Sequence, residues 1–273
     1  MGYNGGMPYL NANGSRLFYS DQGQADGLAL LLLHGAAGSH LVWPGPLRQL
    51  AGARVLALDL PGHGRSDPPG RRTIAHYAAS VAAFVHALAL PDVVIAGHSM
   101  GAAIALTIAL EPPAALRGLA LLGAAGRLRA NEALLGGSLA DFEAAADFIV
   151  EYGFADNGLA VPTAELRRKV RAAILSVGAM TTYGDFLACH RFDARAQLAG
   201  IDLPAWVIAG SADRLVPARA AEALAGGLPR GRLARLEGAG HFSMLERPDE
   251  VAALTAAFLA QTARSLPGQQ PPQ

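Results

Sequence analysis

The sequence predicts an α/β fold, in which helices cover both faces of a parallel sheet. Five short apolar runs lack polar alternation, which is typical of strands buried on both faces. The segments between most of these runs carry apolar residues at helical spacing, so strands and helices alternate along the chain with right-handed crossovers. At 273 residues the chain has room for one large domain, or for one domain with an insertion.

The predicted strands begin with a hairpin over residues 8–23. Its turn is Asn13-Gly14, because both residues tolerate a positive φ. The buried runs that follow are LALLLLHG (28–35), RVLALDLPG (54–62), DVVIAG (92–97), LRGLALLGA (116–124) and PAWVIAG (204–210).

Four helices are predicted from their spacing and their end signals. They span 73–90, 100–110, 217–228 and 247–263. The first has Thr73 as its N-cap and ends before Pro91. The second is almost entirely apolar, which predicts a buried central helix. The last two carry proline at or next to their first residue, and the final one also has acids there, as helix N-termini favour.

Residues 125–189 interrupt the alternation, because they contain helical patterns and no strand-like run. We predict that this segment is an inserted helical cap with at least one apolar face, placed over the edge of the sheet. The core then consists of residues 1–124 and 190–273. Within it, the Pro/Gln-rich residues 265–273 have little to bury and are expected to form a flexible tail.

The composition excludes several functional classes. The chain has 22 basic and 22 acidic residues, whereas nucleic-acid binders usually carry a clustered basic excess. Its N-terminus lacks a signal-peptide pattern, and its apolar runs are shorter than the roughly 20 residues that span a bilayer. The single cysteine, Cys189, cannot form an internal disulfide, which fits a reducing compartment, with a cysteine-poor secreted protein as the alternative. We therefore expect a cytoplasmic monomer or homodimer with no nucleic-acid partner and no membrane span.

The pentapeptide Gly-His-Ser-Met-Gly joins the predicted strand at 92–97 to the helix at 100–110. This is the context of a nucleophile elbow, in which a sharp turn exposes a serine hydroxyl above the sheet. Side chains at Gly97 and Gly101 would collide with the neighbouring strand and helix. The pattern predicts Ser99 as the nucleophile, while a plain glycine-rich turn is the alternative reading.

A serine needs a base, and histidine is the suitable one near neutral pH. Of the eight histidines, His241 lies on a glycine-flanked loop near the C-terminal end, downstream of the serine. Asp213 follows the strand at 204–210 and lies between serine and histidine, so it is the predicted third member. Asp59 precedes the serine and is expected to brace the PGHGRSD turn instead. His98 is expected to point away from the site.

Backbone amides complete the predicted site. Small residues follow the first buried strand, so the Ala36 N–H can approach a carbonyl closely, and the Met100 N–H lies at a helix N-terminus. These two amides form the predicted oxyanion hole. Trp43, Met180 and Phe242 are predicted pocket walls, with ordinary packing as the alternative for each.

Five motifs in sequence order, LLLHGAAG, LDLPGHGRSD, AGHSMGAAIAL, AGSADRLVP and GAGHFSMLERPDEV, resemble those of the α/β-hydrolase superfamily. The resemblance implies a mostly parallel eight-stranded sheet, a Ser99–His241–Asp213 triad, and neither a metal nor an organic cofactor. It is closest to the branch of capped esterases, cofactor-free peroxidase-like enzymes and carbon–carbon bond hydrolases.

Two positions discriminate among the branches of this superfamily. Epoxide hydrolases and haloalkane dehalogenases use an aspartate nucleophile, where this chain has Ser99. Carbon–carbon hydrolases commonly carry Asn before the nucleophile and Trp after the catalytic histidine, where this chain has His98 and Phe242. The sequence thus favours a carboxylesterase acting on small or medium hydrophobic ester substrates. A carbon–carbon bond hydrolase of vinylogous diketones, a perhydrolase or acyltransferase, and a ligand receptor that retains the triad are the alternatives.

Overall fold

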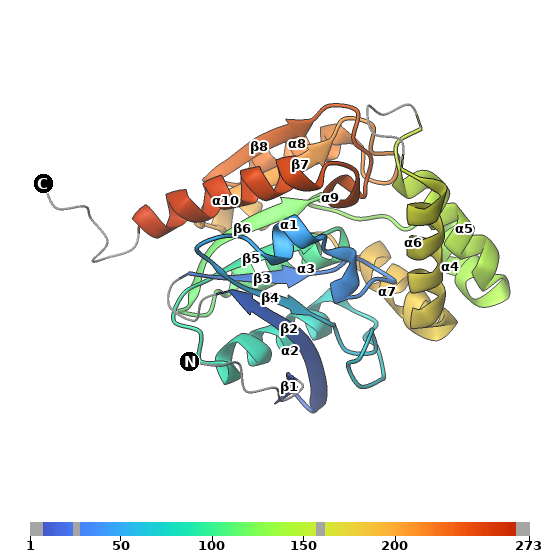
Figure 1. Cartoon of the computed structure of the whole chain (residues 1–273), viewed down its shortest axis with the longest axis horizontal. Coiled ribbons are helices and arrows are strands. Elements are labelled where there is room, and N and C mark those ends of the chain that lie inside the picture. Colours follow the sequence, from blue (N-terminus) through green and yellow to red (C-terminus); the bar gives the residue numbers. More distant parts are fainter. Residues whose placement is uncertain (1–7, 24–27, 157–161, 266–273) are drawn as a thin grey trace, which may run out of the picture.

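The computed structural model describes residues 8–23, 28–156 and 162–265. Within these ranges one sheet contains the strands β1 (Tyr9–Ala12), β2 (Ser15–Gly23), β3 (Ala29–Leu33), β4 (Arg54–Leu58), β5 (Val93–His98), β6 (Leu116–Leu122), β7 (Ala205–Gly210) and β8 (Gly231–Leu236) (Figure 1). The strand order is β1-β2-β4-β3-β5-β6-β7-β8. Only the β1–β2 and β2–β4 pairs are antiparallel, so the predicted mostly parallel eight-stranded fold is confirmed.

Helices cover both faces of this sheet. The helices of the described residues are α1 (Gly45–Arg48), α2 (Ile74–Ala87), α3 (Met100–Leu110), α4 (Glu132–Ala140), α5 (Phe142–Gly153), α6 (Ala164–Val177), α7 (Ala179–Arg191), α8 (Ala218–Gly227), α9 (Ser243–Glu246) and α10 (Pro248–Arg264), with short 3₁₀ helices η1 (His40–Val42) and η2 (Leu198–Gly200). Of these, α2, α3 and α8 pack on one face of the sheet, and α1 and α10 pack on the other.

Alternate strand residues enter two separate cores, because successive side chains point to opposite faces of a sheet. Leu31 and Leu33 of β3 join the core formed with α2, α3 and α8. Leu30 and Leu32 join the core formed with α1 and α10. Both faces are therefore apolar, which explains the unbroken hydrophobic runs in the central strands.

The structure confirms the predicted turn of the N-terminal hairpin and the predicted N-cap of α2. Asn13 and Gly14 have φ of 48° and 72° in the turn between β1 and β2. At the start of α2, the Thr73 hydroxyl accepts a hydrogen bond from the His76 amide at 3.2 Å. Strand β8 is not among the predicted strands, because this edge strand is only partly buried and reads GRLARL, with arginines among its apolar residues.

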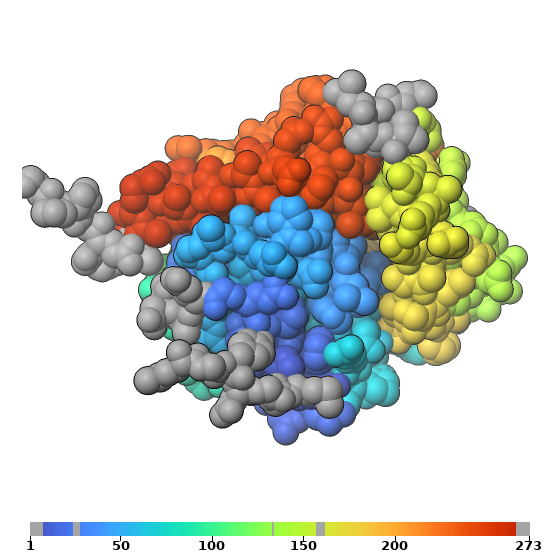
Figure 2. All heavy atoms as spheres, in the orientation of Figure 1, coloured from blue at the N-terminus to red at the C-terminus, as the bar shows by residue number. Residues whose placement is uncertain are grey.

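Four helices, α4 to α7, lie between β6 and β7, and we call them the helical insertion (132–191). Figure 1 shows them beyond one end of the parallel strands, and Figure 2 shows them packed along one side of the molecule. Residues 157–161 of the predicted cap and 266–273 of the predicted tail lie outside the described residues. The division into a core and a cap stays a prediction.

Within the described ranges, no single helix has the length and apolar character to cross a membrane. The consecutive helices α6 and α7 meet the criterion only as a pair, and they are bent by 95° relative to each other.

Candidate active site

Ser99 occupies a sharp turn between β5 and α3, with φ 52° and ψ −111°. A positive φ is strained for a residue with a side chain and is a recurrent feature of functional turns. The flanking glycines permit it. A Cβ on Gly97 would lie 2.3 Å from the Gly101 carbonyl oxygen, and a Cβ on Gly101 would lie 2.2 Å from the Leu33 oxygen. The G-x-S-x-G spacing therefore allows the close approach of α3 to β3 and β5.

His241 and Asp213 are hydrogen-bonded to each other. His241 Nδ1 lies 2.8 Å from Asp213 Oδ2, and both residues are buried. Asp213 is itself oriented, because its Oδ1 accepts hydrogen bonds from the amides of Leu215 at 2.8 Å and Val216 at 2.7 Å. Since Nδ1–H donates to the carboxylate, Nε2 is the nitrogen left free to accept a proton.

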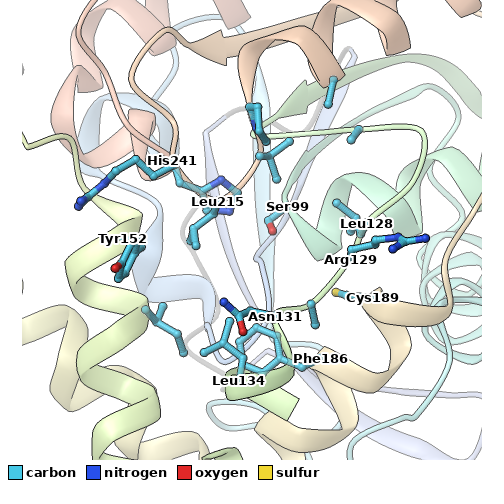
Figure 3. Close-up of a pocket in the computed structure, with 18 of the residues that line it drawn as sticks. Ser99, Leu128, Arg129, Asn131, Leu134, Tyr152, Phe186, Cys189, Leu215 and His241 are labelled. Atoms are coloured by element: carbon cyan, nitrogen blue, oxygen red, sulfur yellow. The ribbon is translucent and has the colours of Figure 1, made fainter. Parts of the chain in front are cut away.

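Ser99 and His241 line the same cavity, which has a volume of about 820 Å³. Figure 3 shows the Ser99 side chain near its centre, with Leu215 on one side and Leu128 on the other. The walls include parts of the loops after β3, β6, β7 and β8, the start of α8 and the helical insertion. Its apolar lining residues include Leu128, Leu134, Phe148, Ile149, Phe186, Leu215, Val216 and Phe242.

The other predicted site residues are distributed unevenly around this cavity. Ala36 and Phe242 line it, and Met100 follows Ser99 at the N-terminus of α3. Trp43 and Met180 do not line it, so their prediction as pocket walls is wrong. Trp43 is fully buried in the core on the α1 and α10 face, and Met180 is 59% exposed at the start of α7.

His98 lies against His241, although it was expected to point away. Its Nε2–H donates to the His241 carbonyl oxygen at 3.0 Å, and the two ring centroids are 4.6 Å apart. Burial, reinforced by the neighbouring His241, lowers the pKa of His98 well below its usual value. A neutral His98 therefore holds the backbone of the loop that carries His241. Its position immediately before Ser99 was the available sequence signal.

Asp59, the rival acid in the sequence, braces a turn as expected. It accepts hydrogen bonds from the amides of His40 at 2.7 Å and Arg65 at 2.9 Å. A Cβ on Gly64 would lie 2.2 Å from this carboxylate. Asp59 does not line the cavity with Ser99.

The buried side chain of His34 contacts the loop that contains Ala36. His34 Nδ1–H donates to the Gly35 carbonyl at 2.8 Å, and its Nε2 accepts from the Leu60 amide at 3.1 Å. Burial and the neighbouring His63 lower the pKa of His34 to about 4, so this ring is neutral near pH 7. His34 thereby ties the loop after β3 to the segment after β4.

Asp185 of α7 connects the helical insertion to the same loop. Its Oδ2 accepts from the Ala37 amide at 2.9 Å and from His63 Nε2 at 2.8 Å, and its Oδ1 accepts from the Tyr77 hydroxyl at 2.6 Å. Both side chains of the His63–Asp185 pair are completely buried. This network is not predictable from the sequence, because its members are far apart in the chain and no motif links them.

A model of the α/β-hydrolase fold family matches residues 29–248 of the chain. The chain belongs to the α/β-hydrolase family. It is 33% identical over 254 residues to a pimeloyl-[acyl-carrier protein] methyl ester esterase of Xanthomonas campestris, covering 86% of this chain and 96% of the relative. It is 28% identical over 255 residues to a putative carbamate hydrolase of Azorhizobium caulinodans, covering 89% and 94%.

Solved structures agree with this assignment. A hydrolase from Pseudomonas aeruginosa superposes on this α/β-hydrolase with a TM-score of 0.82 at 27% identity, covering 94% of this chain and 99% of the other. An esterase from Exiguobacterium antarcticum has a TM-score of 0.85 at 21% identity, covering 92% and 98%, and supports the fold alone. Together the comparisons support a hydrolase.

This α/β-hydrolase has one cysteine at the cavity, Cys189. Burial and the nearby Asp185 raise the pKa of its thiol well above the usual range, so little thiolate forms at neutral pH. In the parts of the chain that the structure describes, no group of three or more His, Cys, Asp or Glu residues is placed to hold a metal ion.

Proposed function

We propose that this α/β-hydrolase is a serine hydrolase that cleaves carboxylic esters through an acyl-enzyme. One observation carries the proposal: the 2.8 Å hydrogen bond that His241 Nδ1–H donates to Asp213 orients His241 in the cavity where the strained turn presents Ser99. Serine becomes nucleophilic only when a positioned base removes its proton, and an oriented, buried imidazole is suited to that role.

In the proposed mechanism, Ser99 Oγ attacks the ester carbonyl carbon while His241 Nε2 takes the hydroxyl proton. The imidazolium then gives this proton to the leaving alcohol, which departs as the carbonyl re-forms in an acyl-enzyme. In the second half, His241 takes a proton from a water molecule, whose oxygen attacks the acyl carbon. The imidazolium then returns the proton to Ser99 Oγ as the carboxylic acid leaves. Asp213 stabilises the imidazolium that forms in both halves of the reaction, without becoming protonated itself.

The developing negative charge requires donors, and the amides of Ala36 and Met100 are the proposed pair. The Met100 amide lies at the N-terminus of α3, where the helix dipole also favours negative charge. Ala36 lines the cavity, and the next amide in the chain, that of Ala37, is fixed by Asp185. Each such donor contributes on the order of 3 kcal/mol of transition-state stabilisation.

The substrate side of the proposal is a small molecule with an apolar part. Leucine, isoleucine, valine and phenylalanine side chains form much of the cavity wall, and these favour alkyl or aryl groups. The ester-hydrolase relative from Xanthomonas campestris, which matches this chain over nearly its whole length, is consistent with ester chemistry.

Replacement of the nucleophile tests the proposal. Ser99→Ala is expected to abolish hydrolysis of p-nitrophenyl butyrate while leaving thermal unfolding close to that of the wild type. The matched control is Ser176→Ala, which removes an exposed hydroxyl in α6 and should leave turnover unchanged. Unchanged turnover by Ser99→Ala would reject the assignment.

A further inference from the structure

The charged side chains around the cavity have one sign. Besides its two histidines, the lining includes five arginines and no aspartate or glutamate from the described residues: Arg127, Arg129, Arg195, Arg214 and Arg219. The whole chain has a formal net charge of zero, so this is a local separation of charge. Clefts lined by one sign of charge concentrate ligands of the opposite sign.

Three of these arginines have structural partners. Arg214 forms an ion pair with Asp156 and donates to the Phe154 carbonyl at 3.1 Å, which links the loop after β7 to the helical insertion. Arg127 and Arg195 share one carboxylate, Asp193, which binds Arg195 in a bidentate manner at 2.9 and 2.7 Å and lies 3.6 Å from Arg127. This trio of side chains retains a net positive charge.

The other two have no such partner. Arg129, in the segment after β6, and Arg219, in the first turn of α8, are exposed, and their side chains make no hydrogen bond or ion pair with any described residue. Figure 3 shows Arg129 and Tyr152 on opposite sides of the cavity, with Ser99 between them. Two guanidinium groups from distant segments therefore line one cavity with their donors unused by the protein.

A neutral ester would not need this arrangement. Figure 3 shows Leu128 and Leu215 on either side of Ser99, whereas Arg129 and Arg219 are exposed residues of the same lining. Guanidinium groups bind carboxylate and phosphate oxygens through paired hydrogen bonds. The cavity thus combines apolar wall residues with two guanidinium groups that have no carboxylate partner among the described residues.

We propose that the natural substrate is an amphiphilic ester that carries an anionic group, a carboxylate or a phosphate, bound by Arg129 and Arg219 while its apolar segment packs near Ser99. This inference rests on the proposed ester hydrolysis at Ser99. It specifies the charge of the ester substrate, which the apolar lining residues alone do not define.

The test compares two substrates that differ only in charge: the p-nitrophenyl monoester of adipic acid, which has a free carboxylate, and the same compound with that carboxylate methylated. We expect wild-type kcat/KM to be at least about tenfold higher for the anionic substrate, as charge-assisted hydrogen bonds predict. Added salt should reduce this preference, because screening weakens exposed charge interactions.

Arg129→Gln/Arg219→Gln should abolish the preference by lowering kcat/KM for the anionic substrate alone. Arg129→Lys/Arg219→Lys, which keeps both charges, should retain most of it. The matched control is Arg168→Gln/Arg264→Gln, which removes two exposed charges outside the cavity lining and should keep the full preference.

Equal wild-type rates for both substrates, or an unchanged preference in the double glutamine variant, would overturn the anionic site. Ser99→Ala tests the proposed chemistry separately: it should lose activity on both substrates, whichever of them the wild type prefers. A second arm with phenyl butyrate and its 4-phosphate or 4-carboxylate derivative shows whether a phosphate or a carboxylate is preferred on the alcohol side.

Discussion

Truncation of Asp185 should destabilise the protein more than truncation of any exposed carboxylate on the helical insertion. Asp185 is fully buried and accepts hydrogen bonds from three donors: the Ala37 amide, His63 Nε2 and the Tyr77 hydroxyl. Asp185→Ala leaves all three donors buried without this acceptor. It also removes the counter-charge of His63, whose Nδ1 faces the Pro61 carbonyl at 3.0 Å.

The expected magnitude follows from this geometry. Breaking a buried ion pair by removing one partner costs about 3–5 kcal/mol, and each unsatisfied buried donor costs about 1–3 kcal/mol. These terms overlap, so we expect the free energy of unfolding to fall by about 3–5 kcal/mol. For a chain of this size that corresponds to a fall in Tm of about 6–20 °C.

The pH dependence gives a second, independent readout. Burial disfavours the charged form of His63, but the charge and hydrogen bond of Asp185 outweigh it and raise the pKa of His63 above 6.5. A raised folded-state pKa stabilises the protein fully below the unfolded pKa of about 6.5, and this stabilisation is lost as pH rises through the folded-state pKa. The difference in stability between the wild type and Asp185→Asn should therefore be larger at pH 6 than at pH 9.

Chemical denaturation of the wild type, Asp185→Ala and Asp185→Asn between pH 6 and 9 measures both effects. Asp147→Ala is the control, since Asp147 pairs with Arg171 on the exposed surface of the insertion, where ion pairs contribute little. Activity should fall with Asp185→Ala even where the variant is folded, because the released Ala37 amide adjoins the proposed oxyanion donor Ala36. A stability loss no larger than that of Asp147→Ala would refute the reasoning.

Two further predictions concern the site itself. Gly101→Ala should destabilise the protein by about 1–3 kcal/mol and reduce turnover, because its Cβ would meet the Leu33 carbonyl oxygen at 2.2 Å. The control is Gly136→Ala, whose Cβ meets nothing within 4 Å and which should leave Tm unchanged or raise it. Equal changes in Tm for the two variants would contradict the steric argument. Asp213→Asn should lower kcat by a factor on the order of 10³–10⁴ with folding retained, and a fall of less than tenfold would argue against its role beside His241.

Short-range patterns determined much of what the sequence could predict. The apolar runs, the Asn13-Gly14 turn and the Thr73 cap depend on residues close in sequence, so they can be predicted without knowledge of the tertiary structure. The motifs around Ser99, Asp213 and His241 each lie at a strand end. Since the carboxyl ends of parallel strands meet at one edge of the sheet, their convergence could be expected.

The remaining features depend on long-range packing. β8 has a weak apolar pattern because it is an edge strand. Trp43 and Met180 were assigned to the pocket by residue type, but one enters a core and the other faces solvent. The Asp185 network joins residues more than 100 positions apart, and the unpartnered state of Arg129 becomes evident only when every neighbouring carboxylate is located.

Covalent labelling tests the nucleophile assignment most directly. A fluorophosphonate transfers its phosphonyl group to an activated serine hydroxyl with loss of fluoride, and the adduct can be located by peptide mass spectrometry. We expect one equivalent of label on Ser99 in the wild type, with parallel loss of esterase activity, and no label in Ser99→Ala. Label on a different residue, or esterase activity that persists after Ser99 is fully modified, would contradict the proposed acyl-enzyme chemistry.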